Sequence, residues 1–206
     1  MSSVTGAAAR WISPLLAFVT LVGLVFSAVT QPSPAVRLTS DDNPLAGKPF
    51  YVDPISAAMS AAKNANPPSP VLTAIANTPQ AYWLDQAFPA PSVANTVSRY
   101  VGAAKAAGSM PVLVIYAIPH RDCGSFAAGG FATGADYSRW IDSVASGLGS
   151  MPAAIILEPD ALDMADCLSS EQRQERYGLI RSAVETLTRN PAAAVGGGGH
   201  EARRSD

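Results

Sequence analysis

Two aspartates, Asp122 and Asp160, each lie just past the end of an apolar run in this 206-residue chain. The first run covers residues 111–116 and the second covers residues 153–157. Hydrolysis of a glycosidic bond needs one carboxyl group to protonate the leaving oxygen and a second to assist the attacking water. A pair of acids delivered in this way therefore predicts acid and base chemistry on a sugar.

The two apolar runs predict strands of a parallel sheet. Each run is continuous rather than alternating and has proline or glycine nearby, as in strands that are buried on both faces. In parallel barrels and doubly wound sheets, the residues just after the strand ends line the reaction site. We therefore expect Asp122 and Asp160 to look into one cleft.

The rest of the chain supplies strands and helices in alternation, which is typical of an α/β fold. Apolar strand centres fall near Tyr51, Trp83, Leu113, Ile156 and Ala194. Two helices are predicted, one from an apolar stripe over residues 137–148 and one beginning at a capping box at Ser169. Their apolar side chains, Trp140 and Tyr177 included, are expected to pack in the core.

Two motifs resemble the signatures of glycoside hydrolase family 6, the inverting cellulases. The first is Tyr116-x-x-Pro119-x-Arg121-Asp122-Cys123-Gly124, followed by Ala127-Ala128-Gly129-Gly130. The second is Ile155-Ile156-Leu157-Glu158-Pro159-Asp160-Ala161-Leu162. Residues 43–53 and 81–85 are also similar to actinobacterial members of this family.

The resemblance covers approximately residues 43–195 and implies the N-terminal half of a catalytic domain. The expected fold is a partial, distorted (β/α) barrel that contains the first four to five βα units. The family's later acidic residue, its proposed base, would fall beyond Val195, and Ala127 and Ala128 stand where many members carry a serine. We therefore expect a truncated chain that hydrolyses β-1,4-glucan poorly or not at all.

The resemblance implies that Asp160 is the general acid. Inversion places the acid and the base-assisted water on opposite faces of the sugar, with carboxyl groups ~6.5 to 9.5 Å apart. A donor must keep its proton near neutral pH, which burial or a second carboxylate promotes. Asp122 is the candidate for that second carboxylate and for orienting the water. A helix cap or a surface turn is the alternative for an aspartate that follows a strand.

The charged neighbours of these acids have supporting roles in this interpretation. Glu158 is expected to hold the geometry of the site rather than to transfer a proton. Arg121 is expected either to act on Asp122 or another carboxylate, or to form an exposed salt bridge. His120 has no partner serine or cysteine in a matching motif, which argues against a nucleophilic triad.

Two aromatic residues are candidates for binding the sugar. Trp83 and Tyr116 end the second and third predicted strands, where the carboxyl-end argument places substrate contacts. The resemblance implies that Tyr116 lies near the distorted ring and Trp83 in a neighbouring subsite. Packing in the core is the alternative for each.

The chain contains two cysteines: Cys123 directly follows Asp122, and Cys167 comes seven residues after Asp160. A bridge between them would tie the two acid-bearing loops together and stabilise the fold by roughly 4 kcal/mol in a loop-entropy model. Two free thiols are the alternative, and a metal site lacks the further ligands that zinc needs. The family resemblance implies the same pairing.

The termini differ in composition from the rest of the chain. Arg10 precedes fifteen uncharged residues at 15–29, which predicts an export signal or an uncleaved membrane anchor over residues 1–29. Residues 30–42 are expected to form a linker and residues 196–206 a disordered tail. The protein is therefore expected to be secreted or held at the cell surface.

Charge and composition limit the partners. The net charge is −2 and no basic cluster occurs, so a nucleic acid is not expected, whereas a neutral β-glucan fits. No cofactor is expected, because Gly196–Gly199 opens no helix and is no phosphate cradle. The alternative function is a catalytically inactive carbohydrate-binding remnant tethered to the cell surface.

Overall fold

The structure is a computed structural model and describes residues 45–197. These residues all belong to one compact unit of the chain, Thr39–Asp206. The predicted export signal, the linker and residues 198–206 lie outside the described residues. Among residues 45–197, no helix is both long enough and apolar enough to cross a bilayer.

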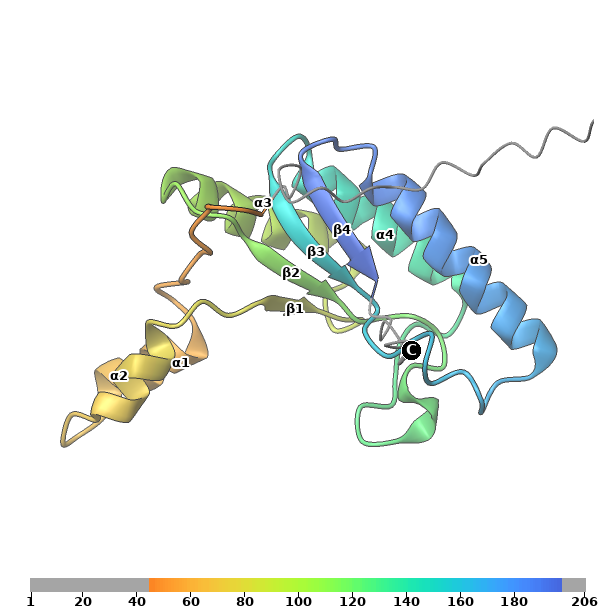
Figure 1. Cartoon of the computed structure of the whole chain (residues 1–206). Helices are drawn as coiled ribbons and strands as arrows, with labels where there is room; N and C mark the ends of the chain where they lie inside the picture. Colours follow the sequence, from red (N-terminus) through yellow and green to blue (C-terminus); the bar gives the residue numbers. More distant parts are fainter. Residues whose placement is uncertain (1–44, 198–206) are drawn as a thin grey trace, which may run out of the picture. The chain divides into compact units, whose positions relative to one another are not determined.

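Four parallel strands form one sheet in the order in which they occur in the sequence (Figure 1). They are β1 (Tyr82–Leu84), β2 (Val112–Ile115), β3 (Ala153–Leu157) and β4 (Ala193–Gly197). Ile115 pairs with Leu157, so β2 and β3 end at the same level of the sheet. The predicted α/β class and four of the five predicted strands are confirmed.

The strand expected near Tyr51 does not form. A single parallel bridge joins Phe50 to Met110, and the Tyr51 amide donates to the Met110 carbonyl oxygen at 2.9 Å. Pro49 and Pro54 lie close to this bridge, and proline has no N–H to extend a hydrogen-bond ladder. Pairing therefore stops after one residue, and this prediction was wrong.

Two short helices follow that segment, α1 (Ala57–Asn64) and α2 (Pro70–Ala76). Each begins at a serine whose hydroxyl accepts a hydrogen bond from a backbone amide of the first turn. Ser56 accepts from Met59 at 3.1 Å, and Ser69 accepts from Leu72 at 3.3 Å.

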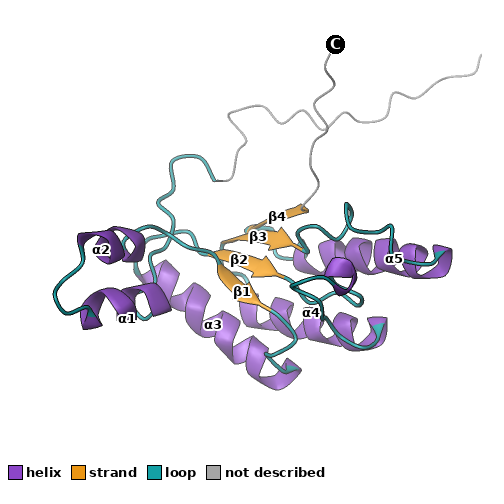
Figure 2. Cartoon of the chain, turned by 90° about the horizontal axis from the view of Figure 1, so that it is seen from below, coloured by secondary structure: helices purple, strands orange, loops and turns teal. Residues whose placement is uncertain are grey.

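Three longer helices connect the strands and cover one face of the sheet (Figure 2). They are α3 (Ala90–Ala106), α4 (Gly134–Leu148) and α5 (Ser170–Leu187). The strand side chains that point toward these helices are fully buried and form part of the core: Leu84, Leu113, Ile115, Ile155 and Leu157. On the other face, Ala154 is buried but the Ile156 side chain is 40% exposed, so the expected burial of β3 on both faces fails at Ile156.

Helix α4 presents the predicted apolar stripe to the core. Its buried residues include Tyr137, Trp140, Ile141, Val144 and Leu148. The Trp140 indole N–H donates to the Phe88 carbonyl oxygen at 2.7 Å, which satisfies the one polar group of that buried ring. The prediction that Trp140 belongs to the core is confirmed.

Helix α5 begins as predicted and packs most of its predicted apolar residues against the core, with one exception. The Ser169 hydroxyl accepts from the Gln172 amide, and the Gln172 side chain accepts from the Ser169 amide, which confirms the capping box. Tyr177 is 39% exposed, so its assignment to the core was wrong. The neighbouring Arg176 takes the inward position instead.

The last strand runs further than expected. Strand β4 includes Gly196 and Gly197, which were assigned to the tail. Both pair with β3, opposite Ile156 and Leu157. Backbone pairing requires no side chain, so two glycines can extend the ladder at the edge of the sheet.

Candidate functional site

Asp122 and Asp160 lie on loops that leave the sheet at the same edge. One loop, residues 116–130, follows β2 and is called the Asp122 loop; the other, residues 158–168, follows β3 and is called the Asp160 loop. The Glu158 amide donates to the Ile115 carbonyl oxygen at 2.8 Å, which extends the β2–β3 ladder by one residue. The parallel register therefore starts both loops side by side, as the sequence predicted.

Both acids are held on left-handed backbone. The φ angles are 58° at Asp122 and 70° at Asp160, and they are 49° at Cys123 and 46° at Glu158. Aspartate tolerates this conformation, whereas cysteine and glutamate adopt it rarely. Such strain persists only where surrounding contacts impose it, and it gathers at functional sites in many proteins.

Asp122 is half-buried and fixed within its own loop. Its Oδ2 accepts a hydrogen bond from the Ala127 amide at 2.6 Å, and its carbonyl oxygen accepts from the Ser125 amide at 2.8 Å. Asp122 also begins a short 3₁₀ turn, Asp122–Gly124. The carboxylate therefore has a set orientation, and the turn-forming role that we kept as an alternative is present as well.

Asp160 is exposed, and its side chain forms no hydrogen bond within residues 45–197. Its backbone carbonyl oxygen accepts from the Met164 amide at 2.8 Å, which holds the turn that carries it. The burial expected for a proton donor is therefore absent in this structure. A prediction from strand position alone cannot tell how much of a loop-end side chain is covered.

Tyr116 connects the two acids electrostatically. Burial is the main cause that raises the pKa of its phenol, and the negative charge of Asp122 raises it further. The Arg121 guanidinium opposes this rise, while Asp160 and Glu158 add to it. Both acids therefore lie within electrostatic reach of the same aromatic ring, as expected for one site.

Trp83 and Tyr116 form an aromatic pair beside the acids. Their ring centroids are 5.6 Å apart at an interplanar angle of 86°. Trp83 is 54% exposed, whereas Tyr116 is half-buried. Trp83 is therefore not a core residue, and its indole is available to a ligand.

Arg121 supports Tyr116 rather than pairing with an acid. Its guanidinium carbon lies 4.4 Å from the Tyr116 ring centroid, a cation–π geometry. It donates to the carbonyl oxygens of Ala127 and Tyr116 and to the Gln86 side chain. Arg121 is buried and forms no salt bridge within residues 45–197, so the exposed salt bridge was a wrong prediction. Its positive charge does act on another carboxylate, because it lowers the pKa of Glu158.

Glycines let the Asp122 loop close over Arg121. A methyl group at Gly129 would lie 2.8 Å from an Arg121 side-chain nitrogen. One at Gly130, where φ is +90°, would lie 1.9 Å from the Ile118 carbonyl oxygen. The small residues of the motif are therefore required by close backbone approach.

Glu158 bridges the two loops from a buried position. Its side chain is 1% exposed, and both carboxylate oxygens accept from the Ala117 amide, at 3.0 and 3.1 Å. Burial raises the pKa of Glu158 to about 7, against the lowering effects of the Ala117 and Ile118 amides and of the Tyr137 hydroxyl. The Tyr137 hydroxyl is buried and acts at longer range, since it has no hydrogen-bond partner among residues 45–197. These contacts agree with the structural role expected for Glu158.

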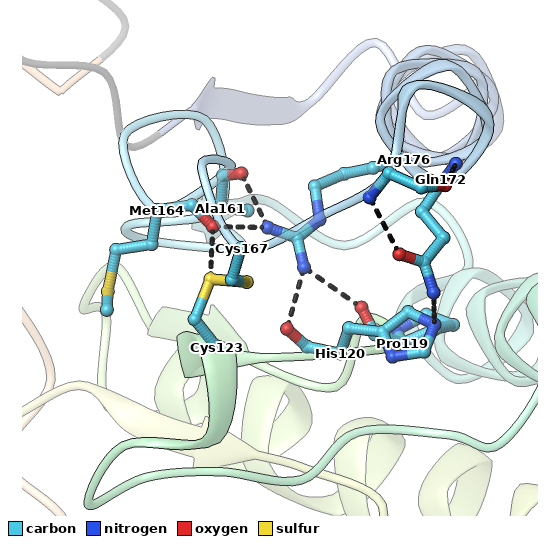
Figure 3. The surroundings of a disulfide bond; sticks show 9 residues. Pro119, His120, Cys123, Ala161, Met164, Cys167, Gln172 and Arg176 are labelled. Atoms are coloured by element: carbon cyan, nitrogen blue, oxygen red, sulfur yellow. Dashed lines mark hydrogen bonds between the residues drawn. A yellow bond between two sulfur atoms is a disulfide. The ribbon is translucent and has the colours of Figure 1, made fainter.

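A disulfide joins Cys123 of the Asp122 loop to Cys167 of the Asp160 loop (Figure 3). The two Cα atoms are 5.7 Å apart, and 44 residues separate the cysteines in the sequence. The predicted bridge is confirmed, and the alternative of two free thiols was wrong. The bridge fixes one contact between the loops that carry the acids.

Sequence reasoning missed Arg176, which lies between the same two loops. Its side chain is 2% exposed and donates to backbone carbonyl oxygens of both loops (Figure 3). His120, also at this junction, has its Nε2 3.2 Å from the Gln172 side-chain nitrogen. The spacing of the sequence indicated the inward position of Arg176, because Arg176 shares a helix face with the apolar residues Ala183 and Leu187.

A cavity of about 520 Å³ beside β1 touches this site only through Trp83. Tyr51, Tyr82 and Tyr100 also line it, but Asp122 and Asp160 do not. Within residues 45–197, no group of three or more His, Cys, Asp or Glu side chains is placed to hold a metal ion. The acids and the aromatic pair therefore define the candidate site better than the cavity does.

Comparisons with known proteins match this chain to one family. The profile described as Glycosyl hydrolases family 6 matches residues 41–200. Endoglucanase A of Thermobispora bispora is 43% identical over 171 residues, which are 81% of this chain and 36% of that protein. Endoglucanase 1 of Streptomyces halstedii is 35% identical over 185 residues, which are 87% of this chain and 55% of that protein.

A solved structure supports the same match. The endoglucanase Cel6 from Mycobacterium tuberculosis, in complex with methyl-cellobiosyl-4-deoxy-4-thio-β-D-cellobioside, is similar to this chain with a TM-score of 0.74 and 74% sequence identity. The similarity covers 75% of this chain and 53% of that chain. This chain thus spans about half of that structure and 36% to 55% of the two curated relatives named above.

Proposed function

The chain belongs to glycosyl hydrolases family 6, and from this membership we propose that it acts on β-1,4-glucosidic bonds in cellulose or a related glucan. The observation that carries the proposal is the placement of two carboxylates at the ends of adjacent parallel strands, on loops joined by a disulfide. The relatives named endoglucanase, and the thio-linked cellobioside bound by one of them, support this substrate class.

Asp160 is the proposed general acid, and Asp122 is its proposed helper in an inverting reaction. The Asp122 carboxylate is oriented by the Ala127 amide, which leaves its other oxygen available to a water molecule. The Asp160 side chain is exposed and is not held by hydrogen bonds within the described residues. A bound glucan would cover Asp160 and supply the water-poor surroundings in which a carboxyl group keeps its proton.

Trp83 and Tyr116 are the proposed binding surface for the sugar rings. The exposed Trp83 indole offers a flat apolar face, and Tyr116 holds it at an edge-to-face angle. Arg121 packs against the Tyr116 ring and is itself held by a hydrogen bond to the Ala127 carbonyl oxygen in the Asp122 loop, so it fixes the position of Tyr116. A rigid aromatic pair binds a flat ring without the loss of side-chain freedom that a mobile residue incurs.

The four βα units are proposed to form the first part of a distorted (β/α) barrel. Two observations support this: the strands follow one another in order, and the sheet face away from the helices carries Trp83 and the 40% exposed Ile156. In a barrel, residues on such a face point to the interior.

Export of the protein is a further part of the proposal. The Cys123–Cys167 disulfide supports an oxidising compartment, where such bridges persist. A secreted or cell-surface location also brings the chain to a polysaccharide, and membrane association would then depend on residues 1–29. Fractionation of producing cells tests this, with recovery only in the cytoplasmic fraction as the contrary result.

The activity test compares three forms of the chain on carboxymethylcellulose. We expect the unaltered chain to release reducing ends slowly, Asp160→Asn to release none, and Asp163→Asn, an exposed control in the same loop, to match the unaltered chain. An Asp160→Asn variant that keeps the unaltered rate would refute the role of Asp160.

A carbohydrate-binding protein without turnover is the second candidate function. The exposed Trp83 indole, which can bind a sugar ring without any acid chemistry, favours it. Cellotetraose binding by all three forms, with no reducing ends from any of them, supports this second function over the first.

A further inference from the structure

Arg176 lies at the junction of the two acid-bearing loops and contacts both through backbone oxygens (Figure 3). Its Nη1 donates to the carbonyl oxygens of Ala161 at 3.0 Å and Met164 at 2.8 Å. Its Nη2 donates to the carbonyl oxygens of Pro119 at 3.1 Å and His120 at 2.7 Å. One guanidinium thus joins two acceptors from each loop, and we call this arrangement the Arg176 clamp.

The clamp acts close to both aspartates in the sequence. His120 precedes Asp122 by two positions, and Ala161 directly follows Asp160. A shift of either carbonyl group would therefore be passed to an acid through one or two peptide units. Because His120, Asp122 and Asp160 themselves lie on left-handed backbone, their conformation depends on such external contacts.

The Arg176 guanidinium is charged and buried, so it needs hydrogen-bond acceptors around it. The side chain is 2% exposed, and burial lowers the pKa of its guanidinium, while the Glu158 charge opposes that change. Within residues 45–197 no carboxylate forms a salt bridge with it, and its Nε has no hydrogen-bond partner. A buried charge without an ion pair must be satisfied by hydrogen bonds, so the four carbonyl oxygens are its counterparts.

Arginine suits this position better than lysine. The planar guanidinium offers donors in a rigid fork that can meet pairs of acceptors in fixed directions. A lysine ammonium is a compact group with three donors and cannot satisfy four acceptors that lie on two separate loops. The geometry therefore uses a property that is specific to arginine.

The clamp and the disulfide meet at one atom. The Met164 carbonyl oxygen accepts from Arg176 and lies 3.0 Å from the Cys123 sulfur. This sulfur contact is not a hydrogen bond, because a disulfide sulfur carries no proton. The two ties between the loops are therefore adjacent, but only the disulfide can be broken by reduction.

We propose that Arg176 is a positioning residue that holds the Asp122 loop and the Asp160 loop together whether or not the Cys123–Cys167 bridge is formed. The catalytic meaning of this role depends on the proposed function, but the mechanical coupling does not. The first test is therefore a redox measurement, which reports on the loops even if the chain hydrolyses no glucan.

The redox test equilibrates the folded chain with mixtures of reduced and oxidised dithiothreitol. The reagent supplies two electrons and two protons, the disulfide becomes two thiols, and dithiothreitol becomes its cyclic disulfide. Without the clamp the thiols lie together less often, so Arg176→Met should make reduction easier by about tenfold, which is ~30 mV for this two-electron couple. Arg176→Lys should give a smaller shift in the same direction.

Two control variants separate the clamp from general effects. Arg181→Met removes an exposed arginine from the same helix, and Leu187→Ala weakens the core at the other end of α5. Both should leave the equilibrium constant for reduction unchanged while the chain remains folded. An unchanged constant in Arg176→Met, or an equal shift in Leu187→Ala, would overturn the proposal.

A second measurement needs no variant at Arg176 and decides the matter if Arg176→Met does not fold. Nuclear magnetic resonance of the guanidinium protons is recorded on the unaltered chain with the disulfide intact and then reduced. A clamp that persists gives Arg176 protons that remain resolved and slow to exchange in both states. Collapse to an averaged, fast-exchanging signal on reduction would show that the clamp depends on the bridge.

The activity test then separates this inference from the proposed function. If the chain hydrolyses glucan, Arg176→Lys should lower turnover in the reduced protein more than in the oxidised protein. A redox shift without any hydrolysis would support the clamp and reject the enzyme. Hydrolysis by the unaltered chain, together with an unchanged reduction equilibrium in Arg176→Met, would support the enzyme and reject the clamp.

Discussion

Replacing Glu158 by glutamine should change how the stability of the fold depends on pH. Burial raises the pKa of Glu158 to about 7 in the folded protein, whereas its ordinary value is 4.5. Between these two pH values, the folded chain binds a proton at Glu158 more strongly than the unfolded chain does. The stability contributed by this group therefore falls as pH rises from about 4.5 to 7.

The size of the effect follows from the two pKa values. Each pKa unit corresponds to 1.36 kcal/mol, so the rise from 4.5 to about 7 lowers the free energy of unfolding by about 3 kcal/mol above pH 7. Glutamine is uncharged at every pH and cannot make this contribution. The stability of Glu158→Gln relative to the unaltered chain should therefore rise by about 3 kcal/mol between pH 4 and pH 8.

Urea unfolding followed by circular dichroism at several pH values measures this difference. Glu185→Gln, on the exposed side of α5, is the control because it removes one carboxyl group without touching the site. The control should give a curve parallel to that of the unaltered chain. A Glu158→Gln curve that is also parallel would refute the claim that Glu158 is buried with a raised pKa.

Two further predictions concern the aromatic pair and the glycine turn. Trp83→Ala should weaken cellotetraose binding about tenfold, as measured by calorimetry, because the exposed indole is the proposed sugar contact. The same variant should lower the free energy of unfolding by less than about 1.5 kcal/mol, whereas Trp140→Ala, which removes a buried ring, should lower it by about 3 to 5 kcal/mol. Equal losses of stability would contradict the assigned burial. Gly130→Ala should lower the free energy of unfolding by at least about 2 kcal/mol, because its methyl group would meet the Ile118 carbonyl oxygen on a backbone with positive φ. Gly196→Ala, which has open space around it, should stay within about 0.5 kcal/mol in the same unfolding assay.

Local patterns were sufficient to predict the elements that position the acids. Continuous apolar runs specify β2 and β3, and parallel pairing then brings the loops of Asp122 and Asp160 to the same edge. The capping box at Ser169 is a short-range signal, so the start of α5 was predictable from four residues. The disulfide was predicted from the family resemblance, and its two cysteines lie on the two loops that carry the acids.

Features that depend on contacts between distant segments were not predictable in the same way. The burial of Arg121 depends on Tyr116, Gln86 and the turn at Gly129, which local sequence does not bring together. The exposure of Asp160 depends on what covers the loop, not on its place after a strand.

The inward turn of Arg176 was missed for a different reason. A charged residue in the core stripe of a helix contradicts simple apolar periodicity, which favoured Tyr177 instead. Only the carbonyl oxygens of two folded loops make the inward position favourable for Arg176. Such a position becomes visible once those loops are placed.

The central claim is that Asp122 and Asp160 converge on one glucan, and a crystal structure of this chain with a thio-linked cellotetraoside tests it most directly. The predicted result has sugar rings against Trp83 and Tyr116, with the Asp160 carboxyl group about 3 Å from the linking sulfur. The Asp122 carboxylate should lie beside the same linkage, on its loop joined to the other by the disulfide. A ligand bound away from both acids, or bound with Asp160 directed to solvent, would contradict the account.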